Sequence, residues 1–265
     1  MTTPPVTFVI AGSEATGGAG VQADLRTLQQ LGVYGAAALT CIVSFDPKDG
    51  WNHRFVPIDS QVLRDQAEAI LADWQPASVK IGMLGTVPTI ETTRDILTAA
   101  KLPNIVCDPV LICKGQEPGA ALDIDNALRA EILPIVDVIT PNYFETCTLA
   151  GVDEIDTVAG LGDAAKKISE LGTKAVLVKG GLATPGDNAV DVLWDGSELI
   201  EYARPKVGTT GVSGAGDSLA TAVSAGLAQG KSLHDAVDAA KDFVTAGIQR
   251  AISANTPFDV VWQGE

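Results

Sequence analysis

One carboxylate stands where a glycine-rich loop passes into a run of small residues. The stretch GTTGVSGAGDSLATAVSAGLAQG, residues 208–230, surrounds Asp217 with glycine, alanine and serine. Backbone N–H groups at a helix N-terminus attract anions, and the GAG at 214–216 leaves these groups unshielded by large side chains. A carboxylate beside such an anion site can take the proton of a substrate hydroxyl as that oxygen attacks phosphorus. The stretch therefore predicts phosphoryl transfer with Asp217 as general base, the alternative being an ordinary helix-start acid.

A second glycine loop lies near the start of the chain, in AGSEATGGAGVQADL at residues 11–25. A P-loop requires Lys-Ser or Lys-Thr after its last glycine, whereas Gly18 and Ala19 follow Gly17 here. The GxGxxG spacing of dinucleotide-binding loops is also absent. The glycines still allow the backbone to approach a ligand closely, although a plain strand–helix turn would use them too.

The elements that must position these loops alternate along the chain, as in a doubly wound parallel sheet. Apolar runs predict strands at 6–12, 35–45, 78–84, 104–111, 136–142 and 174–181. Helical spacing predicts helices at 20–32, 60–74, 89–101, 124–134, 161–172, 216–230 and 233–252. The segment 190–204 alternates like a hairpin, with Asp195-Gly196 as its turn.

Polar residues gather where the predicted strands end. Asp108, Asn142 and Lys179 each follow or close an apolar run. Ligands of open parallel sheets sit at the carboxyl ends of the strands, so these side chains predict a binding site at that edge. Asp-Pro and Pro-Asn are also ordinary turn sequences, which is the competing interpretation.

Composition limits the possible partners. The chain has 265 residues, is 46% hydrophobic and carries a net charge of -15, so we expect one domain over 1–265. No basic cluster favours nucleic acid, and no apolar run reaches the roughly 18 residues of a membrane span. No signal peptide is evident, and the four cysteines lack zinc-site spacing. We therefore expect a cytoplasmic protein with neither a nucleic-acid nor a membrane partner.

Six segments in order make a family resemblance specific. GSEATGGAGVQADLRTLQQLGVYG, VKIGMLGT, DPVLICKG, ITPNYFE, VLVKGG and GAGD resemble the ribokinase superfamily, most closely its hydroxymethylpyrimidine kinase and bacterial pyridoxal kinase branch. The resemblance covers residues 6 to about 250. It implies an α/β, ribokinase-like three-layer sandwich with a mostly parallel central sheet, helices on both faces and a small flap. It also implies ATP and Mg²⁺ as cofactors, a heteroaromatic alcohol as substrate, and a homodimer with the flap near its interface.

The resemblance also implies roles for individual residues on the nucleotide side. Asp217 matches the catalytic base, and Gly214, Ala215 and Gly216 match the anion hole. Asn142 and Glu145 match a motif that organises magnesium and phosphates, and Asp108 matches a residue that faces the same metal. Lys179 resembles a nucleotide-binding position, and Lys241 a residue near the adenine pocket.

On the substrate side, Asp24 matches a residue that hydrogen-bonds the ring. The expected pocket walls are Gly12, Ser13, Val43, Met83 and Val110. CIVSFDPKDGWNHRFVP and LICKGQEP resemble the flap and lid of pyridoxal kinases. There, His53 can bond ring substituents, Cys113 can add to an aldehyde, and Lys114 brings positive charge to the ATP phosphates.

One departure affects the choice of substrate. Vitamin kinases of this branch usually carry cysteine where this chain has Asp217, the residue that the wider superfamily uses. The flap and lid favour pyridoxal and related B6 vitamers. The alternatives are a hydroxymethylpyrimidine or phosphomethylpyrimidine kinase, a non-catalytic vitamin- or nucleotide-binding protein, and a sugar kinase.

Overall fold

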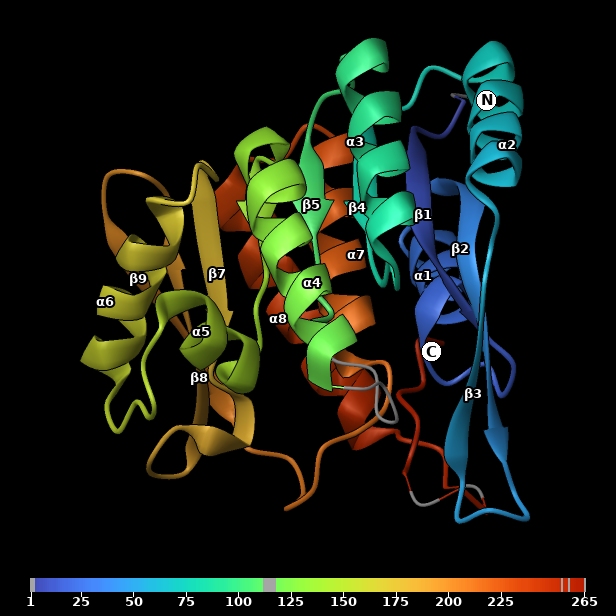
Figure 1. Cartoon of the computed structure of the whole chain (residues 1–265). Coiled ribbons are helices and arrows are strands. Elements are labelled where there is room, and N and C mark those ends of the chain that lie inside the picture. The colour runs from blue at the N-terminus through green and yellow to red at the C-terminus, as the bar shows by residue number, and fades with distance from the viewer. Residues whose placement is uncertain (1–2, 112–117, 254, 257, 265) are drawn as a thin grey trace.

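A nine-stranded sheet forms the centre of the part of the chain that the structure describes (Figure 1). The structure is a computed structural model, and it describes residues 3–111, 118–253, 255, 256 and 258–264. The strand order is β3-β2-β1-β4-β5-β6-β7-β8-β9. The strands are β1 (Val6–Glu14), β2 (Tyr34–Asp46), β3 (Asn52–Pro57), β4 (Ser78–Ile81), β5 (Ile105–Cys107), β6 (Val138–Ile139), β7 (Ala175–Lys179), β8 (Asn188–Trp194) and β9 (Leu199–Pro205). Strands β2, β1, β4, β5, β6 and β7 run parallel, whereas β3, β8 and β9 are antiparallel additions at the two edges.

Helices cover both faces of this sheet, which confirms the predicted three-layer α/β sandwich (Figure 1). One face carries α2 (Ser60–Asp73), α3 (Val87–Ala100), α4 (Pro118–Ala127), α5 (Tyr143–Ala150) and α6 (Val158–Ser169). The other carries α1 (Gly20–Gln30), α7 (Ala215–Ala228) and α8 (Leu233–Gln249). Short π- and 3₁₀-helical turns, Leu128–Ile132 and Leu133–Ile135, extend α4, and a 3₁₀ turn, Gly181–Ala183, follows β7.

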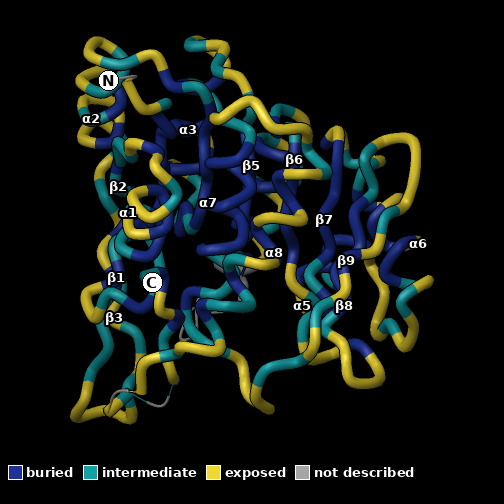
Figure 2. The backbone as a smooth tube through the Cα atoms, turned by 180° about the vertical axis from the view of Figure 1, so that it is seen from behind, coloured by how far each residue is buried: buried dark blue, intermediate teal, exposed yellow. Residues whose placement is uncertain are grey.

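The alternation of side chains along each strand assigns them to the two layers. On β1, Phe8 and Ile10 pack in the core beneath α2–α6, whereas Val9 packs with α1. On β4, Val79 and Ile81 belong to the same core as Phe8. The alternate positions on β4, Ser78 and Lys80, therefore face α1 and α7. Figure 2 shows the central strands and α7 buried, with exposed backbone concentrated at the rim.

The resemblance to kinases of this superfamily predicted a flap, and the structure contains one. Strands β2 and β3 form an antiparallel ribbon that projects beyond the rest of the sheet (Figure 1). Phe45 pairs with His53 across this ribbon, and their rings lie 4.6 Å apart. The C-terminal segment runs beside the ribbon, where Val260 bridges to Ser213 and Ile252. None of the helices described is long and apolar enough to span a bilayer.

Helix α5 was not among the predicted helices. Asn142 precedes it and accepts a hydrogen bond from the Glu145 N–H at 3.0 Å, while Glu145 accepts one from the Asn142 N–H at 2.8 Å. This reciprocal pair is a capping box, which starts a helix by satisfying two orphan N–H groups. The same Asn-x-x-Glu that resembles a ligand-organising motif is thus also a local helix signal.

Candidate active site

Two cavities lie side by side at the carboxyl edge of the parallel strands, and Asp217 lines both. Their volumes are about 710 and 730 Å³. The residues common to both are Val110, Thr210, Gly211, Val212 and Asp217. A ligand in each cavity could therefore approach the same carboxylate, which is the arrangement that transfer between two substrates requires.

The first cavity lies between the flap, the loop after β1 and the C-terminal segment. It is lined by six of the residues predicted for the substrate pocket, namely Gly12, Ser13, Val43, His53, Met83 and Val110. Five residues that were not predicted also line it: Glu14, Phe45, Thr256, Phe258 and Asp259. Cys113 and Lys114 fall outside the residues that the structure describes.

Asp24 lies behind the first cavity and not in its wall, contrary to the expected contact with the substrate ring. Its side chain is fully buried and is not among the residues that line the first cavity. Lys80 Nζ donates to both of its oxygens, at 2.7 and 2.8 Å, and Thr221 Oγ1 donates to Oδ1 at 2.7 Å. The carboxylate therefore holds a lysine behind the pocket, and the prediction that it bonds the substrate ring does not fit this geometry.

Lys80 connects Asp24 to Asp217. Lys80 Nζ lies 3.1 Å from Asp217 Oδ1, and the lysine side chain is completely inaccessible to solvent. Burial alone would lower the pKa of Lys80, but the carboxylates of Asp24, Asp217 and Asp108 outweigh that penalty and raise it. A lysine in this setting stays charged.

The two carboxylates that share Lys80 differ in their ionisation. Burial raises the pKa of Asp24 to about 7, and the attraction of Lys80 only partly offsets that effect. Burial also acts against ionisation of Asp217, but the charge and hydrogen bond of Lys80, and the Gly20 N–H, hold its pKa below the usual range. Asp217 is thus an ionised carboxylate at neutral pH, available to accept a proton.

Backbone conformation places Asp217 in the first turn of α7. Gly214 precedes this helix with a φ of +78°, in the left-handed region that glycine adopts without strain. A Cβ at Gly214 would lie 2.2 Å from the Gly18 carbonyl oxygen, so the two glycine loops touch. Ala215 and Gly216 line the second cavity with Asp217, so the N-terminus of α7 faces that space.

The second cavity contains the polar residues predicted at the strand ends, Asp108, Asn142 and Lys179. Glu145 on α5 and Lys241 on α8, which the resemblance assigned to the nucleotide side, also line it. Lys179 Nζ donates to Asp108 Oδ1 at 2.7 Å. A Cβ at Gly216 would lie 3.2 Å from Lys179 Nζ, so this glycine lets the lysine approach the start of α7. The ammonium group of Lys179 therefore lies beside the N-terminus of α7, in the same cavity that Asp217 lines.

Carboxylates on this side can also hold a cation. Asp108 and Glu145 are buried, and oxygen ligands of this kind suit Mg²⁺. Burial and the nearby charge of Asp108 raise the pKa of Glu145 to about 7, although Lys179 opposes the shift. A divalent cation would compete with the proton on Glu145. The two carboxylates therefore offer oxygen ligands that suit Mg²⁺, provided that Glu145 is ionised.

Lys241 occupies the far end of the second cavity. Its Nζ forms a buried ion pair of 2.6 Å with Asp191 Oδ2, while Asp191 Oδ1 accepts from the Gly180 N–H at 3.1 Å. The lysine is thereby tied to the glycine turn after β7. Lys241 lines the cavity, and its charge already has a partner in Asp191.

Comparison with known proteins identifies the family of the chain. The sequence pattern of the phosphomethylpyrimidine kinase family matches residues 14–262. The chain belongs to the phosphomethylpyrimidine kinase family. A pyridoxine kinase of Bacillus subtilis is 42% identical over 248 residues, which cover 94% of this chain and 92% of that protein.

Other relatives lie on both branches of the phosphomethylpyrimidine kinase family. A hydroxymethylpyrimidine/phosphomethylpyrimidine kinase of Haemophilus influenzae is 36% identical over 250 residues, covering 93% of this chain and 91% of that protein. The pyridoxal kinase from Staphylococcus aureus in complex with AMP-PCP and pyridoxal superposes with a TM-score of 0.91 and 35% identity. That match covers 99% of this chain and 94% of the other.

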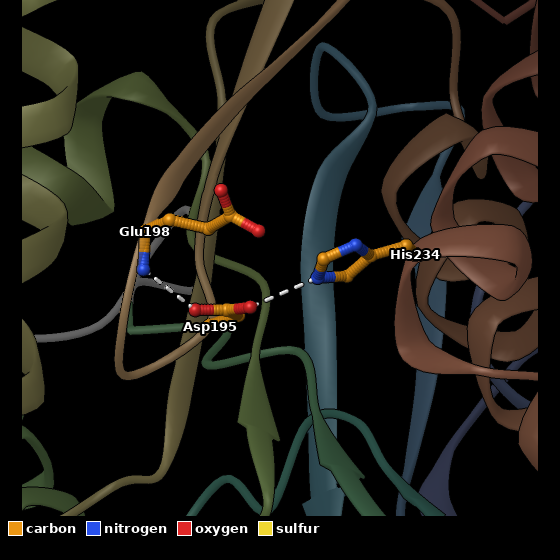
Figure 3. A group of neighbouring side chains, drawn as sticks. All are labelled: Asp195, Glu198 and His234. Carbon is orange, nitrogen blue, oxygen red and sulfur yellow. Dashed lines mark hydrogen bonds and ion pairs between the residues drawn. The ribbon is translucent and has the colours of Figure 1, made fainter.

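One cluster of possible metal ligands lies apart from both cavities of this family member. Asp195, Glu198 and His234 bring one ligand atom each to within 4.8 Å of one another (Figure 3). Asp195 Oδ1 accepts from the N–H groups of Ser197 and Glu198, and Oδ2 bonds His234 Nε2 at 2.9 Å. These bonds fix the β8–β9 turn to the start of α8, which accounts for the cluster without a metal.

Proposed function

We propose that this chain is an ATP-dependent kinase that phosphorylates the hydroxymethyl group of pyridoxal and related B6 vitamers. The observation that carries the proposal is the position of Asp217, which lines two adjacent cavities of similar volume. The first cavity would hold the vitamin, and the second ATP. The family supports this assignment, because pyridoxine and pyridoxal kinases are among its relatives.

Asp217 would act as the general base. As the substrate oxygen attacks the γ-phosphorus, its proton passes to the Asp217 carboxylate, the new O–P bond forms and the bond to ADP breaks. The N–H groups at the start of α7 and the ammonium group of Lys179 would stabilise the charge on the migrating phosphoryl group. A carboxylate with a low pKa suits this role, because little proton transfer is needed until the bond to phosphorus is well formed.

Asp108 and Glu145 would hold Mg²⁺, which in such sites neutralises phosphate charge. Asn142 would serve them indirectly, because its cap fixes the position of Glu145. Lys241, paired with Asp191, would orient the turn after β7 beside the adenine end of the nucleotide.

The first cavity suits a flat heteroaromatic ring. Val43, Phe45, Met83 and Val110 supply apolar walls, and His53 adds one polar group from the flap. Such a site, mostly apolar with a few fixed polar groups, is typical of small-molecule recognition. In this proposal Cys113 serves the vitamin substrate, and Lys114 serves the ATP phosphates.

We further propose that the chain is a single domain over 1–265, works in the cytoplasm and forms a homodimer through the flap. Ile42 on β2 and Val56 on β3 are exposed apolar side chains on this ribbon, 45% and 57% accessible. Sedimentation of the purified protein tests the dimer. A monomer at micromolar concentration would contradict it.

The activity is tested by incubating the purified protein with ATP, Mg²⁺ and pyridoxal and measuring ADP release and vitamin phosphate together. We expect turnover, and Asp217→Asn to lower kcat by about 10²-fold or more with ATP binding retained. Near-normal turnover of that variant would exclude Asp217 as the base. ATP binding without phosphorylation of any alcohol would leave a binding protein.

The second candidate is a hydroxymethylpyrimidine/phosphomethylpyrimidine kinase. It is favoured by the family pattern itself and by the relative from Haemophilus influenzae. The same assay with pyridoxal, hydroxymethylpyrimidine and its monophosphate decides between them. A higher kcat/KM for the pyrimidine, together with phosphorylation of the monophosphate, would replace the first assignment by the second.

A further inference from the structure

Lys80 is buried behind the candidate base Asp217 and takes no part in the proposed phosphoryl transfer itself. Lys80 is the third residue of β4, and its ammonium group lies between the carboxylates of Asp24 and Asp217. Thr221, one turn after Asp217 on α7, donates to Asp24 from the same helix. The result is a closed set of contacts that joins α1, β4 and α7.

The burial of Lys80 excludes direct contact with a ligand. Its side chain and that of Asp24 are both 0% accessible, whereas Asp217 retains 16%. The backbone makes room for this arrangement, because a Cβ at Gly82 would lie 2.9 Å from Lys80 Nζ and 3.0 Å from the Ala11 Cβ. Lys80 can therefore influence a reaction only through neighbouring side chains, and Asp217 is the one among them that it bonds and that lines both cavities.

We propose that Lys80 is a positioning residue for phosphoryl transfer, holding Asp217 by one oxygen while Asp24 and Thr221 hold the lysine in place. The proposal rests on the proposed function, since it assumes that Asp217 is the base. Lys80 occupies Oδ1 of Asp217 and so restricts rotation of the carboxylate. The Gly20 N–H also bonds this carboxylate, so its orientation toward the substrate hydroxyl would be set from two sides.

The charge of Lys80 matters as much as its contact. Asp24 and Asp217 both lie beside one ammonium group in a buried setting. Without Lys80, burial would favour the protonated form of Asp217, and only the Gly20 N–H and the more distant charge of Lys179 would oppose it. A protonated carboxyl cannot accept the hydroxyl proton, so loss of Lys80 would deplete the base on the acid side of the pH profile.

The test is the pH dependence of kcat/KM for pyridoxal in Lys80→Met, at saturating MgATP. Methionine is close to lysine in length and carries no charge. We expect a fall in kcat of about 10²-fold near neutral pH, as for a misplaced catalytic group, and an acid limb moved upward by about 1–3 pH units. The titration of pyridoxal itself is common to both enzymes and cancels in the comparison. An unchanged acid limb would overturn the proposal.

A double-mutant cycle separates a positioning role from a general loss of structure. If Lys80 acts through Asp217, Lys80→Met should change kcat by less than about twofold in the Asp217→Asn background. Multiplicative losses would contradict the proposal. Ser78→Ala is the matched control, because Ser78 lies two residues earlier on the same face of β4 and bonds only Thr7 and Ser224 among the contacts found. That variant should leave the acid limb in place.

Two outcomes distinguish this inference from the proposed function. If Asp217→Asn is inactive while Lys80→Met keeps native turnover and pH dependence, only the role of Lys80 falls. If Asp217→Asn stays active, both the assignment of Asp217 as the base and the role of Lys80 are contradicted. Should Lys80→Met not fold, Lys80→Met/Asp24→Asn leaves no stranded charge at Asp24 and is subject to the same pH test, with the same result overturning the proposal.

Discussion

Two lysine–carboxylate clusters lie on either side of Asp217, and their difference is a matter of burial. Lys80 on β4 pairs with Asp24 and Asp217, while Lys179 at the end of β7 pairs with Asp108. Lys80 is sealed from solvent, whereas Lys179 lines the second cavity. The same residue types thus form one cluster that is closed to solvent and another that opens on a cavity.

The positions of the two lysines along their strands explain this difference. Lys80 lies within β4 and points into the layer between the sheet and α7. Lys179 is the last residue of β7, where the strand reaches the edge of the sheet that borders the second cavity. A charge in mid-strand needs a complete set of protein partners, whereas a charge at the strand end can leave a bond for a phosphate.

The largest expected effect is on stability, from Lys80→Met. Removing one partner of a buried ion pair leaves an uncompensated charge and costs about 3–5 kcal/mol. We expect Lys80→Met/Asp24→Asn to recover most of that loss, because the stranded carboxylate is then gone. Urea unfolding of both variants measures the difference. Equal free energies of unfolding for the single and double variants would show that the Asp24–Lys80 pair does not act as a unit.

The second prediction concerns function at the other cluster. Lys179→Met should lower kcat/KM for ATP by about 10²-fold, since it removes a positive charge beside the migrating phosphoryl group. The KM for pyridoxal should change little, because Lys179 does not line the first cavity. Steady-state kinetics with each substrate varied in turn checks this. A larger effect on pyridoxal than on ATP would reverse the assignment of the two cavities.

The sequence predicts the second cluster better than the first. Asp108, Asn142 and Lys179 follow apolar runs, and the carboxyl ends of parallel strands share one edge, so their proximity follows from topology. Lys80 stands inside the apolar run SVKIGML, which predicts a strand without saying what its ammonium group meets. The signal that was available is the charge itself, since a lysine in a central strand needs a buried acid.

Other features depend on contacts between distant parts of the chain. Thr221 donates to Asp24 across 197 residues, which no local pattern on α1 predicts. The expectation that this carboxylate bonds the ring rests on the family resemblance alone. Thr256, Phe258 and Asp259 reach the first cavity because the C-terminal segment pairs with Ser213. In contrast, local periodicity and the succession of motifs along the sequence were enough to predict the alternation of strands and helices and the fold class.

The third prediction uses ionisation to separate the clusters. Because burial raises the pKa of Glu145 to about 7, this carboxyl carries a proton below that pH in the free protein. Its proton stabilises the fold at low pH, and that contribution is lost as pH rises from about 4 to about 7. Cation binding needs the ionised form, so the affinity for MgATP should fall about tenfold between pH 8 and pH 6.

Titration calorimetry at several pH values, with a non-hydrolysable ATP analogue, measures this dependence. Glu145→Gln should bind more weakly and with a flatter pH profile, and proton release on binding should disappear with it. Lys80→Met should keep the native profile, because its effect falls on the other cluster. A native slope in Glu145→Gln would assign the titration to another group.

The smallest expected effects come from two glycines that make room for the two lysines. At Gly216, a methyl group would lie 3.2 Å from Lys179 Nζ and 3.4 Å from Asp108 Oδ2, so a flexible side chain can move by a few tenths of an ångström. At Gly82, the methyl group would meet Lys80 Nζ at 2.9 Å and the rigidly held Ala11 Cβ at 3.0 Å. Overpacking of this kind costs about 1–3 kcal/mol.

We therefore expect Gly82→Ala to lower the free energy of unfolding by about 1–3 kcal/mol and Gly216→Ala to lower it by less. The order should reverse for nucleotide affinity, because only Gly216 lines the second cavity. Urea unfolding and calorimetry on the same preparations compare the two variants directly. If Gly82→Ala weakened nucleotide binding more than Gly216→Ala, the sealed cluster would be coupled to the nucleotide and not only to Asp217.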